Sequence, residues 1–228
     1  MPETLWPLRF FDPKTPFAIV ERELPHWAQA GSLCFLTWRT HDSMPRSVLE
    51  AWYAERHAWL RKHGIAPDSP DWRLRLHALG GDSEVEFLRA FSDRWQEHLD
   101  DCHGACVLER PDLAAIVAEA LKRFDGDRYD LTDFVVMPNH VHVLVAFPGE
   151  PAMLAHCESW KRFSATKINR LLGRRGRFWQ QDGFDHLVRS AEQFEYLRGY
   201  IAANPRKAGL PPGVGVHFSK PFEVLSVT

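Results

Sequence analysis

Three runs of apolar residues predict the strands of a sheet. The first covers Leu33–Arg39, and two more lie within residues 130–147. All three are rich in β-branched and aromatic residues, which are typical of strands with at least one buried face. Pro138 and Asn139 separate the second run from the third, and this pair favours a tight turn. We therefore expect residues 130–147 to form an antiparallel hairpin.

Apolar residues at helical spacing predict helices around these strands. Two helices are expected over residues 47–63 and over about residues 83–99. Pro111 is a favourable first residue for a third helix. The apolar stripe of this third helix consists of Leu113, Ile116, Val117, Ala120, Leu121 and Phe124. A fourth stripe, which Gly173 is placed to end, consists of Trp160, Phe163, Ile168, Leu171 and Leu172.

The last predicted helix begins at Ser190. Ser190 and Gln193 have the spacing of a capping box, in which each side chain bonds to the backbone of the first turn. The apolar stripe of this helix consists of Phe194, Leu197 and Ile201. Because proline disfavours helical geometry at the residue before it, we expect the helix to end near Asn204 and Pro205.

Strands interleaved with helices around a central hairpin indicate an α+β fold, in which helices pack against an antiparallel sheet. The length of 228 residues fits one domain, or one domain that carries a large insertion. A hydrophobic content of 45% with nine tryptophans supplies material for a buried core. The tail from about residue 211 contains proline and glycine, and we expect it to lie extended over the surface.

The charge of the chain is distributed unevenly, although its net value is only −2. Residues 161–177, here called the basic segment, contain no acidic residue. The segment carries Lys161, Arg162, Lys167, Arg170, Arg174, Arg175 and Arg177. By contrast, seven acidic residues and two arginines lie between residues 82 and 101. The basic segment is either a surface that contacts phosphates or a solvated helix face, and Phe178 and Trp179 beside it either stack on bases or pack in the core.

The sequence has no feature of a membrane or exported protein. No apolar run is long enough to cross a bilayer, and the N-terminus lacks a basic-then-apolar signal pattern. The four cysteines, at positions 34, 102, 106 and 157, have no tight pairing and suit a reducing compartment. These observations predict a soluble cytoplasmic protein.

Two histidines begin the third predicted strand. His140 and His142 are separated by one residue, so their side chains project from the same face of the strand and form half of a divalent-metal site. A plainer interpretation is a pair of partly exposed histidines that bond to water or backbone. On the last helix, Tyr196, Tyr200 and Asn204 recur at four-residue spacing along one flank. That flank either faces a neighbouring strand or packs at the edge of the core.

Five short motifs occur in one order along the chain. They are Met-Pro-Asn-His-Val-His at 137–142, Ser-Trp-Lys at 159–161, Arg-Phe-Trp-Gln at 177–180, Phe-Asp at 184–185 and Tyr-Ile-x-x-Asn-Pro-x-x-Ala-Gly-Leu at 200–210. In this order and spacing they resemble the single-tyrosine HUH transposases, and specifically the REP-associated tyrosine transposases. The resemblance covers Leu33–Arg39 and most of residues 107–210. Residues from about 40 to 104 have no counterpart in the minimal family domain and resemble an insertion.

The resemblance implies a ferredoxin-like antiparallel sheet packed against helices, the HUH endonuclease fold, in a single domain over residues 1–228 with a helical insertion. It implies that His140 and His142 bind a divalent ion, that Asn204 completes the metal site, and that Tyr200 is the catalytic nucleophile. Tyr196 ranks as a distant second choice. These positions show no departure from the family pattern.

Enzymes of this family cut single-stranded DNA and form a covalent 5′-phosphotyrosine. The resemblance therefore implies a metal-dependent endonuclease and strand transferase that acts on hairpin-forming, REP-type DNA. Mg²⁺ or Mn²⁺ is the expected cofactor, because two imidazoles and an amide oxygen leave positions open in an octahedral shell, and zinc stays open on ligand type alone. The expected partner is single-stranded or hairpin DNA, contacted by the basic segment. The chain acts as a monomer or a homodimer.

Three alternatives remain open at this point. The chain could be a domesticated protein that recognises DNA hairpins without cutting them. It could be a metal-dependent hydrolase of small phosphoesters, which would use the histidines but leave Tyr200 and the basic segment without a role. Finally, His98, Cys102, His103 and Cys106 could bind zinc, although their spacing matches no common zinc template.

Overall fold

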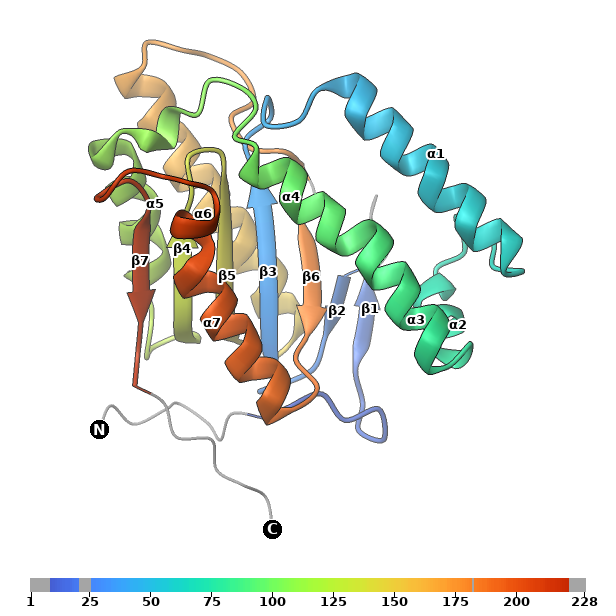
Figure 1. Cartoon of the computed structure of the whole chain (residues 1–228). Helices are drawn as coiled ribbons and strands as arrows, with labels where there is room; N and C mark the ends of the chain where they lie inside the picture. Colours follow the sequence, from blue (N-terminus) through green and yellow to red (C-terminus); the bar gives the residue numbers. More distant parts are fainter. Residues whose placement is uncertain (1–8, 21–25, 182, 222–228) are drawn as a thin grey trace. The chain divides into compact units, whose positions relative to one another are not determined.

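The structure is a computed structural model that describes residues 9–20, 26–181 and 183–221 (Figure 1). The chain divides into two compact units. The first unit consists of Met1–His41 and Cys106–Thr228, and the second unit is Asp42–Ala105. The interpretation of residues from about 40 to 104 as an insertion into a family domain stays a prediction.

The first unit contains a sheet and three long helices. In chain order its elements are β1 (Ala18–Val20), β2 (His26–Ala28), β3 (Leu33–Arg39), the short 3₁₀ helix η2 (Val107–Glu109), α5 (Pro111–Lys122), β4 (Asp130–Val136), β5 (His140–Ala146), α6 (Glu150–Leu171), β6 (Phe184–Leu187), α7 (Ala191–Lys207) and β7 (Val216–Ser219). The predicted strand Leu33–Arg39 and the predicted hairpin of β4 and β5 are confirmed.

Five strands form the central sheet in the order β6-β3-β5-β4-β7, with every neighbouring pair antiparallel. Within the first unit, β3, α5, β4, β5, α6 and β6 follow one another as β-α-β-β-α-β, and their strand order is that of a ferredoxin-like fold. The predicted α+β fold, with an antiparallel sheet against helices, is therefore confirmed. Strand β7 extends this sheet beyond β4, and β1 pairs with β2 in a separate small sheet.

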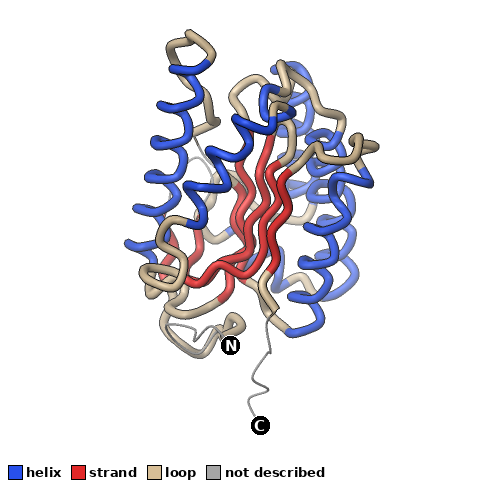
Figure 2. Tube along the Cα trace, turned by 90° about the vertical axis from the view of Figure 1, so that its left-hand side faces the viewer, coloured by secondary structure: helices blue, strands red, loops and turns tan. Residues whose placement is uncertain are grey.

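Helices cover both faces of the sheet. Neighbouring residues of a strand point to opposite sides, so each strand contributes side chains to both layers. On one face, Leu36 and Val143 belong to a core cluster with Leu113 and Val117 of α5 and Trp160 of α6. On the other face, a second cluster packs the sheet against α7. This second cluster contains Leu33, Phe35, Val135, Met137, Leu144, Ala146, Phe194, Leu197 and Ile201. The strands run between helices on either side in Figure 2.

The second unit is helical and has a core of its own. It consists of α1 (Arg46–Lys62), α2 (Trp72–Ala78), α3 (Gly81–Phe87), the π-helical turn η1 (Leu88–Asp93) and α4 (Arg94–Asp100). Its core contains Leu60, Ile65, Trp72, Leu76, Phe87 and Phe91. The last three elements follow one another without a break, as expected for a helix over about residues 83–99.

Several elements were not predicted from the sequence. Helix α2 and the short strands β1, β2 and β6 had no assignment, and α6 begins ten residues before the stripe that Trp160 opens. Within the tail that was expected to lie extended over the surface, Val216–Ser219 form β7 and pair with β4. Helix α7 does not end at Asn204 and Pro205 but continues to Lys207. The proline lies in the last turn of the helix, so few hydrogen bonds of the helix come after it. The backbone N–H of Ala208 still donates to the Asn204 oxygen at 3.0 Å, and the helix continues past the proline.

No helix of the described part of the chain combines the length and the apolar character needed to pass through a bilayer.

An ion pair joins α7 to the sheet. The Arg198 Nε atom lies 3.0 Å and 3.2 Å from the two carboxylate oxygens of Asp133 on β4, whose side chain is 1% exposed. The same guanidinium donates to the Ser219 hydroxyl and to the Lys220 oxygen, at 2.9 Å and 2.8 Å. Arg198 therefore holds α7 against both β4 and the end of β7.

Removing this arginine should destabilise the first unit strongly. Arg198→Ala leaves the Asp133 carboxylate buried without its cation, so the free energy of unfolding should fall by about 3–5 kcal/mol, measured by urea denaturation. The matched control is Arg110→Ala, whose ion pair with Asp112 is more than half exposed and should contribute little. Equal effects of the two substitutions would contradict the role given to Arg198.

Candidate active site

The two histidines at the start of β5 lie on the sheet face that α7 covers. His140 and His142 are both fully buried, and their ring centroids are 4.7 Å apart. Strand pairing places Arg39 opposite His140 and Thr37 opposite His142. The plainer expectation, a partly exposed pair bonded to water, is wrong because the strand lies in the middle of the sheet under a helix.

Both imidazole rings have close partners at the Nδ1 atom. The Nδ1 atom of His140 lies 2.7 Å from the Asn139 side-chain oxygen. The Nδ1 atom of His142 lies 2.7 Å from the Thr37 hydroxyl oxygen. In addition, the ring of His142 stacks on Phe35, with centroids 5.4 Å apart and planes inclined by 14°. These contacts fix the orientation of each ring.

Burial keeps both histidines neutral. It lowers the pKa of His140 from the usual 6.5 to about 3. The pKa of His142 is also lowered well below 6.5, first by burial and then by the neighbouring His140. A metal-binding imidazole must be neutral, so both rings are in the protonation state that a metal ion requires at neutral pH.

The tyrosine helix brings its polar flank to the same place. The Tyr200 hydroxyl oxygen lies 3.4 Å from His142 Nε2, and the Tyr200 ring contacts both His142 and Phe35 edge-on. A separation of 3.4 Å is long for a hydrogen bond, so the phenol lies beside the imidazole without a strong bond to it. Tyr196, one turn earlier, is 67% exposed. The flank thus divides into a partly buried part at Tyr200 and an exposed part at Tyr196.

Asn204 lies one helical turn after Tyr200 and is fully buried. Neither its side-chain oxygen nor its side-chain nitrogen has a hydrogen-bond partner among the described residues. A buried amide without partners costs about 1–3 kcal/mol for each unsatisfied group. Such a cost points to a ligand that the carboxamide would bind.

These residues fit a divalent metal ion. Two neutral imidazoles and one carboxamide oxygen are ligands that Mn²⁺ accepts, and a set of three leaves positions open for phosphate or water. Within the described residues, no group of three or more His, Cys, Asp or Glu side chains could hold a metal ion. A metal site at the histidine pair would therefore need a third ligand of another type, and the Asn204 carboxamide is the candidate.

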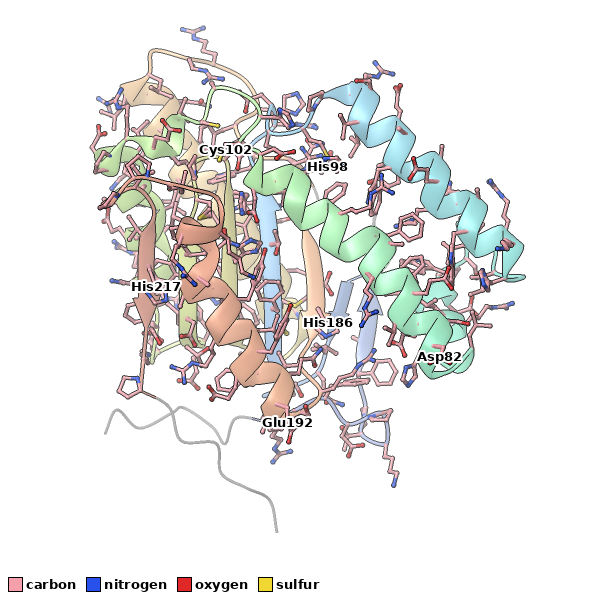
Figure 3. All side chains as sticks on the ribbon, viewed as in Figure 1. Asp82, His98, Cys102, His186, Glu192 and His217 are labelled. Atoms are coloured by element: carbon pink, nitrogen blue, oxygen red, sulfur yellow. The ribbon has the colours of Figure 1, made fainter. Side chains whose placement is uncertain are left out.

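Other histidines and cysteines do not form a comparable centre. His186 on β6 and His217 on β7 share the sheet face of His142 but lie on the outer strands (Figure 3). The His186 Nε2 atom accepts a bond from the Gln193 amide at 2.7 Å. In the second unit, His98 and His103 lie 3.9 Å and 3.7 Å from the Asp101 carboxylate. The suggested zinc site at residues 98–106 is thus not supported in the described part of the chain.

The helical part of the basic segment lies on the opposite face of the sheet from the histidine pair. Helix α6 packs with α5 in the core cluster that excludes α7. Two of its cations also have protein partners. Lys161 donates to the Gln180 and Gln181 backbone oxygens, and Lys167 lies 3.3 Å from the Glu119 carboxylate. Arg162 and Arg170 are exposed.

The loop after α6 reaches the histidine end of the sheet. It carries Arg174, Arg175 and Arg177, all exposed. Beyond the loop, Trp179 bridges to Thr40, and the Gln180 N–H donates to the Arg39 oxygen at 2.9 Å. Since Arg39 pairs with His140, the loop is the part of the basic segment nearest to the histidines along the backbone.

The base-stacking interpretation of the neighbouring aromatic residues is wrong. Phe178 and Trp179 are each 4% exposed and belong to the core under α6. The Trp179 indole N–H donates to the Ser164 hydroxyl at 2.9 Å. These rings have no free face for a base.

Sequence reasoning did not identify Thr37 or Asn139 as part of the site. Asn139 was assigned to the turn of the hairpin, although its place directly before His140 was a signal of contact. Thr37 had no local signal, because it lies 105 residues from His142 and meets it only through strand pairing.

Comparisons with known proteins give little further information. No protein-family model matches the chain, and no curated protein matches it. A solved structure of the REP-associated tyrosine transposase bound to a REP hairpin is similar at a TM-score of 0.45 and 14% sequence identity, over 82% of this chain and 73% of that chain. We draw no functional conclusion from a similarity this distant.

The buried histidines should make the stability of the metal-free protein depend on pH. Because the folded-state pKa values lie below the unfolded value of 6.5, the unfolded chain binds more protons at acidic pH. The free energy of unfolding should therefore fall as pH drops from 6.5 toward 3, by about 1.4 kcal/mol per pH unit for each histidine. Urea denaturation from pH 7 to pH 5 with a chelator measures this slope.

The control is the double variant His140→Gln with His142→Gln, which should show a flatter slope. Only slopes are compared, so a lower absolute stability of the variant does not affect the result. A variant slope as steep as that of the original chain would show that other groups cause the pH dependence.

Proposed function

We propose that this protein is a metal-dependent, single-stranded DNA endonuclease and strand transferase that acts on hairpin-forming DNA through a covalent 5′-phosphotyrosine. The observation that carries the proposal is the distance of 3.4 Å between the Tyr200 hydroxyl on α7 and His142 Nε2 on β5. The Asn204 carboxamide one turn beyond is buried without a hydrogen-bond partner among the described residues, which supports its proposed role as a third ligand. A hydrolase of small phosphoesters would leave the phenol beside the imidazoles without a role.

Tyr200 is the nucleophile of the proposed reaction. Its oxygen forms a bond to the phosphorus of a phosphodiester as the bond between phosphorus and the 3′-oxygen breaks. The phenol loses its proton as it attacks, and the leaving 3′-oxygen takes up a proton, so the products are a 5′-phosphotyrosine and a free 3′-hydroxyl. The phosphotyrosine conserves the phosphodiester energy, so a later attack by a 3′-hydroxyl rejoins DNA and releases the tyrosine.

His140, His142 and Asn204 would hold the divalent ion. When bound, Mg²⁺ or Mn²⁺ supplies positive charge for the scissile phosphate and the leaving 3′-oxygen. The protein residues orient and enclose the reacting groups. Phe35 and the apolar side chains of α7 exclude water from the inner side of the site, and the contacts of His142 keep its ring fixed beside the phenol.

The loop arginines offer a path for DNA toward this site. Arg174, Arg175 and Arg177 are exposed and precede the segment that pairs with Thr40 and Arg39. A DNA strand whose phosphates contact these arginines would approach the histidine end of the sheet. We propose that Arg162, Lys167 and Arg170 on α6 contact more distant phosphates, and that Lys161 instead supports the loop through its bonds to the backbone.

The substitution Tyr200→Phe should abolish covalent attachment to DNA. It removes the nucleophilic oxygen but keeps the ring that packs on Phe35, so the dissociation constant for DNA should change less than about threefold. The measurement is adduct formation on labelled single-stranded hairpin oligonucleotides with Mn²⁺ or Mg²⁺. Tyr196→Phe is the matched control and should form the adduct normally.

Normal adduct formation by Tyr200→Phe would overturn the assignment of the nucleophile. If the unaltered chain binds hairpins tightly but never forms an adduct, the protein is a hairpin-binding protein and the proposed cleavage is wrong.

Reversing Arg174 and Arg175 to glutamate should weaken DNA binding and reduce its salt dependence. Each lost phosphate contact should lower the slope of log affinity against log salt by about 0.7 for single-stranded DNA. Fluorescence anisotropy at several salt concentrations measures the slope. The control reverses Arg61 and Lys62, an exposed pair at the end of α1, and should change the slope less. Unchanged affinity of the Arg174 and Arg175 variant would remove the loop from the DNA path.

A further inference from the structure

The partners of the two Nδ1 atoms are as buried as the histidines themselves. Asn139 is fully buried and Thr37 is 3% exposed. Both distances to the imidazole nitrogens are 2.7 Å, which is short for bonds of this type. One polar side chain from the hairpin turn and one from β3 thus contact the Nδ1 atoms of the two rings.

The chemistry of the partner decides which nitrogen of a neutral imidazole carries the proton. A carboxamide oxygen can only accept, so the contact with Asn139 requires a proton on Nδ1 of His140. A neutral ring has one N–H, and the Nε2 atom is then left with a lone pair. The Thr37 hydroxyl can accept or donate, so the same arrangement holds for His142 when the hydroxyl accepts from Nδ1. The Nε2 atom of His142, which lies 3.4 Å from the Tyr200 hydroxyl, then keeps its lone pair.

We propose that Asn139 and Thr37 are the positioning residues of the metal site. They hold His140 and His142 in the Nδ1–H tautomer and direct both Nε2 lone pairs to the face where Tyr200 and Asn204 lie. This inference rests on the proposed function for its metal ion, but the tautomers belong to the metal-free protein. A bond to the second ring nitrogen orients a metal-binding imidazole and strengthens it as a ligand, and its loss costs 10-fold to 100-fold in metal affinity.

The substitution Thr37→Val tests the inference with little change of shape. It should lower the affinity of the full chain for Mn²⁺ by about 10-fold to 100-fold, measured by the electron paramagnetic resonance signal of free Mn²⁺. Thr37→Ser keeps the hydroxyl and should retain an affinity within about threefold of the original. Asn139→Asp keeps the acceptor oxygen and should retain more affinity than Asn139→Ala.

Thr132→Val is the matched control for the loss of a buried hydroxyl. Thr132 lies on β4 of the same sheet, is 1% exposed, and donates to the Leu144 backbone oxygen at 3.2 Å. Its hydroxyl bonds to that backbone oxygen and not to a histidine ring, so its loss should affect stability but not the affinity for Mn²⁺. Equal loss of Mn²⁺ affinity in Thr132→Val and Thr37→Val would reduce Thr37 to a structural residue and overturn the inference.

Nitrogen-15 spectra of the histidine rings give a readout that needs neither metal nor DNA. In the metal-free chain at pH 7, Nδ1 should carry the proton and Nε2 should not, for both His140 and His142. In Thr37→Val, the ring of His142 should lose this preference while the ring of His140 keeps it. A proton on Nε2 of either ring in the unaltered chain would overturn the inference.

The outcomes separate this inference from the proposed function. An unaltered chain that forms the DNA adduct but binds Mn²⁺ equally well with and without the Thr37 hydroxyl would overturn the inference and leave the nuclease standing. An unaltered chain that binds no Mn²⁺ would also overturn it. A chain with both Nδ1–H tautomers and Thr37-dependent Mn²⁺ affinity, but no adduct, would support the inference and overturn the proposed cleavage.

Discussion

The packing of α7 on the sheet is the constraint on which the site depends. Phe194, Leu197 and Ile201 bury one stripe of the helix, and the ion pair of Arg198 with Asp133 fixes its rotation. Each residue of a helix turns it by about 100°, so a shift by one residue would carry Tyr200 away from His142. The geometry of the candidate site is therefore a consequence of core packing. The polar groups of the site depend on apolar contacts several residues away.

The same packing buries polar groups, and their burial lowers the stability of the fold. Two imidazoles, a hydroxyl and two carboxamides are buried near one another, and burial holds the imidazoles neutral. The Asn204 amide lacks protein partners within the described residues. Stability alone would favour apolar residues at these positions, because unsatisfied buried polar groups weaken a fold. A cluster of this kind is more typical of a functional site, where strain and desolvation are maintained by the surrounding structure.

Local patterns were sufficient for much of the fold and for grouping four candidate residues into two pairs. Apolar runs identified β3 and the hairpin, and helical spacing identified α5 and α7 because each has a continuous buried stripe. The spacing of His140 with His142, and of Tyr200 with Asn204, already placed each pair on one face. Short strands such as β6 and β7 were missed, since four residues carry too little pattern to stand out. Thr37 was missed because its contact with His142 depends on the pairing of β3 with β5, which no local pattern reveals.

Sequence order did not reveal on which face of the sheet each part of the basic segment lies. Lys167 and Arg170 lie between the histidine strand and the tyrosine helix along the chain, yet α6 crosses to the other face of the sheet. The crossover between two strands of a ferredoxin-like sheet places its helix by the handedness of the connection, independently of charge. Only the loop beyond α6 returns to the histidine end, so the expectation of DNA contact is stronger for Arg174, Arg175 and Arg177 than for the helix itself.

Anomalous diffraction from crystals soaked in Mn²⁺ tests the central claim most directly. The account predicts one strong peak within bonding distance of the Nε2 atoms of His140 and His142 and of the Asn204 side-chain oxygen, with the Tyr200 hydroxyl beside it. A histidine pair that binds no ion at millimolar Mn²⁺, or an ion bound there with Asn204 and Tyr200 turned away, would contradict it.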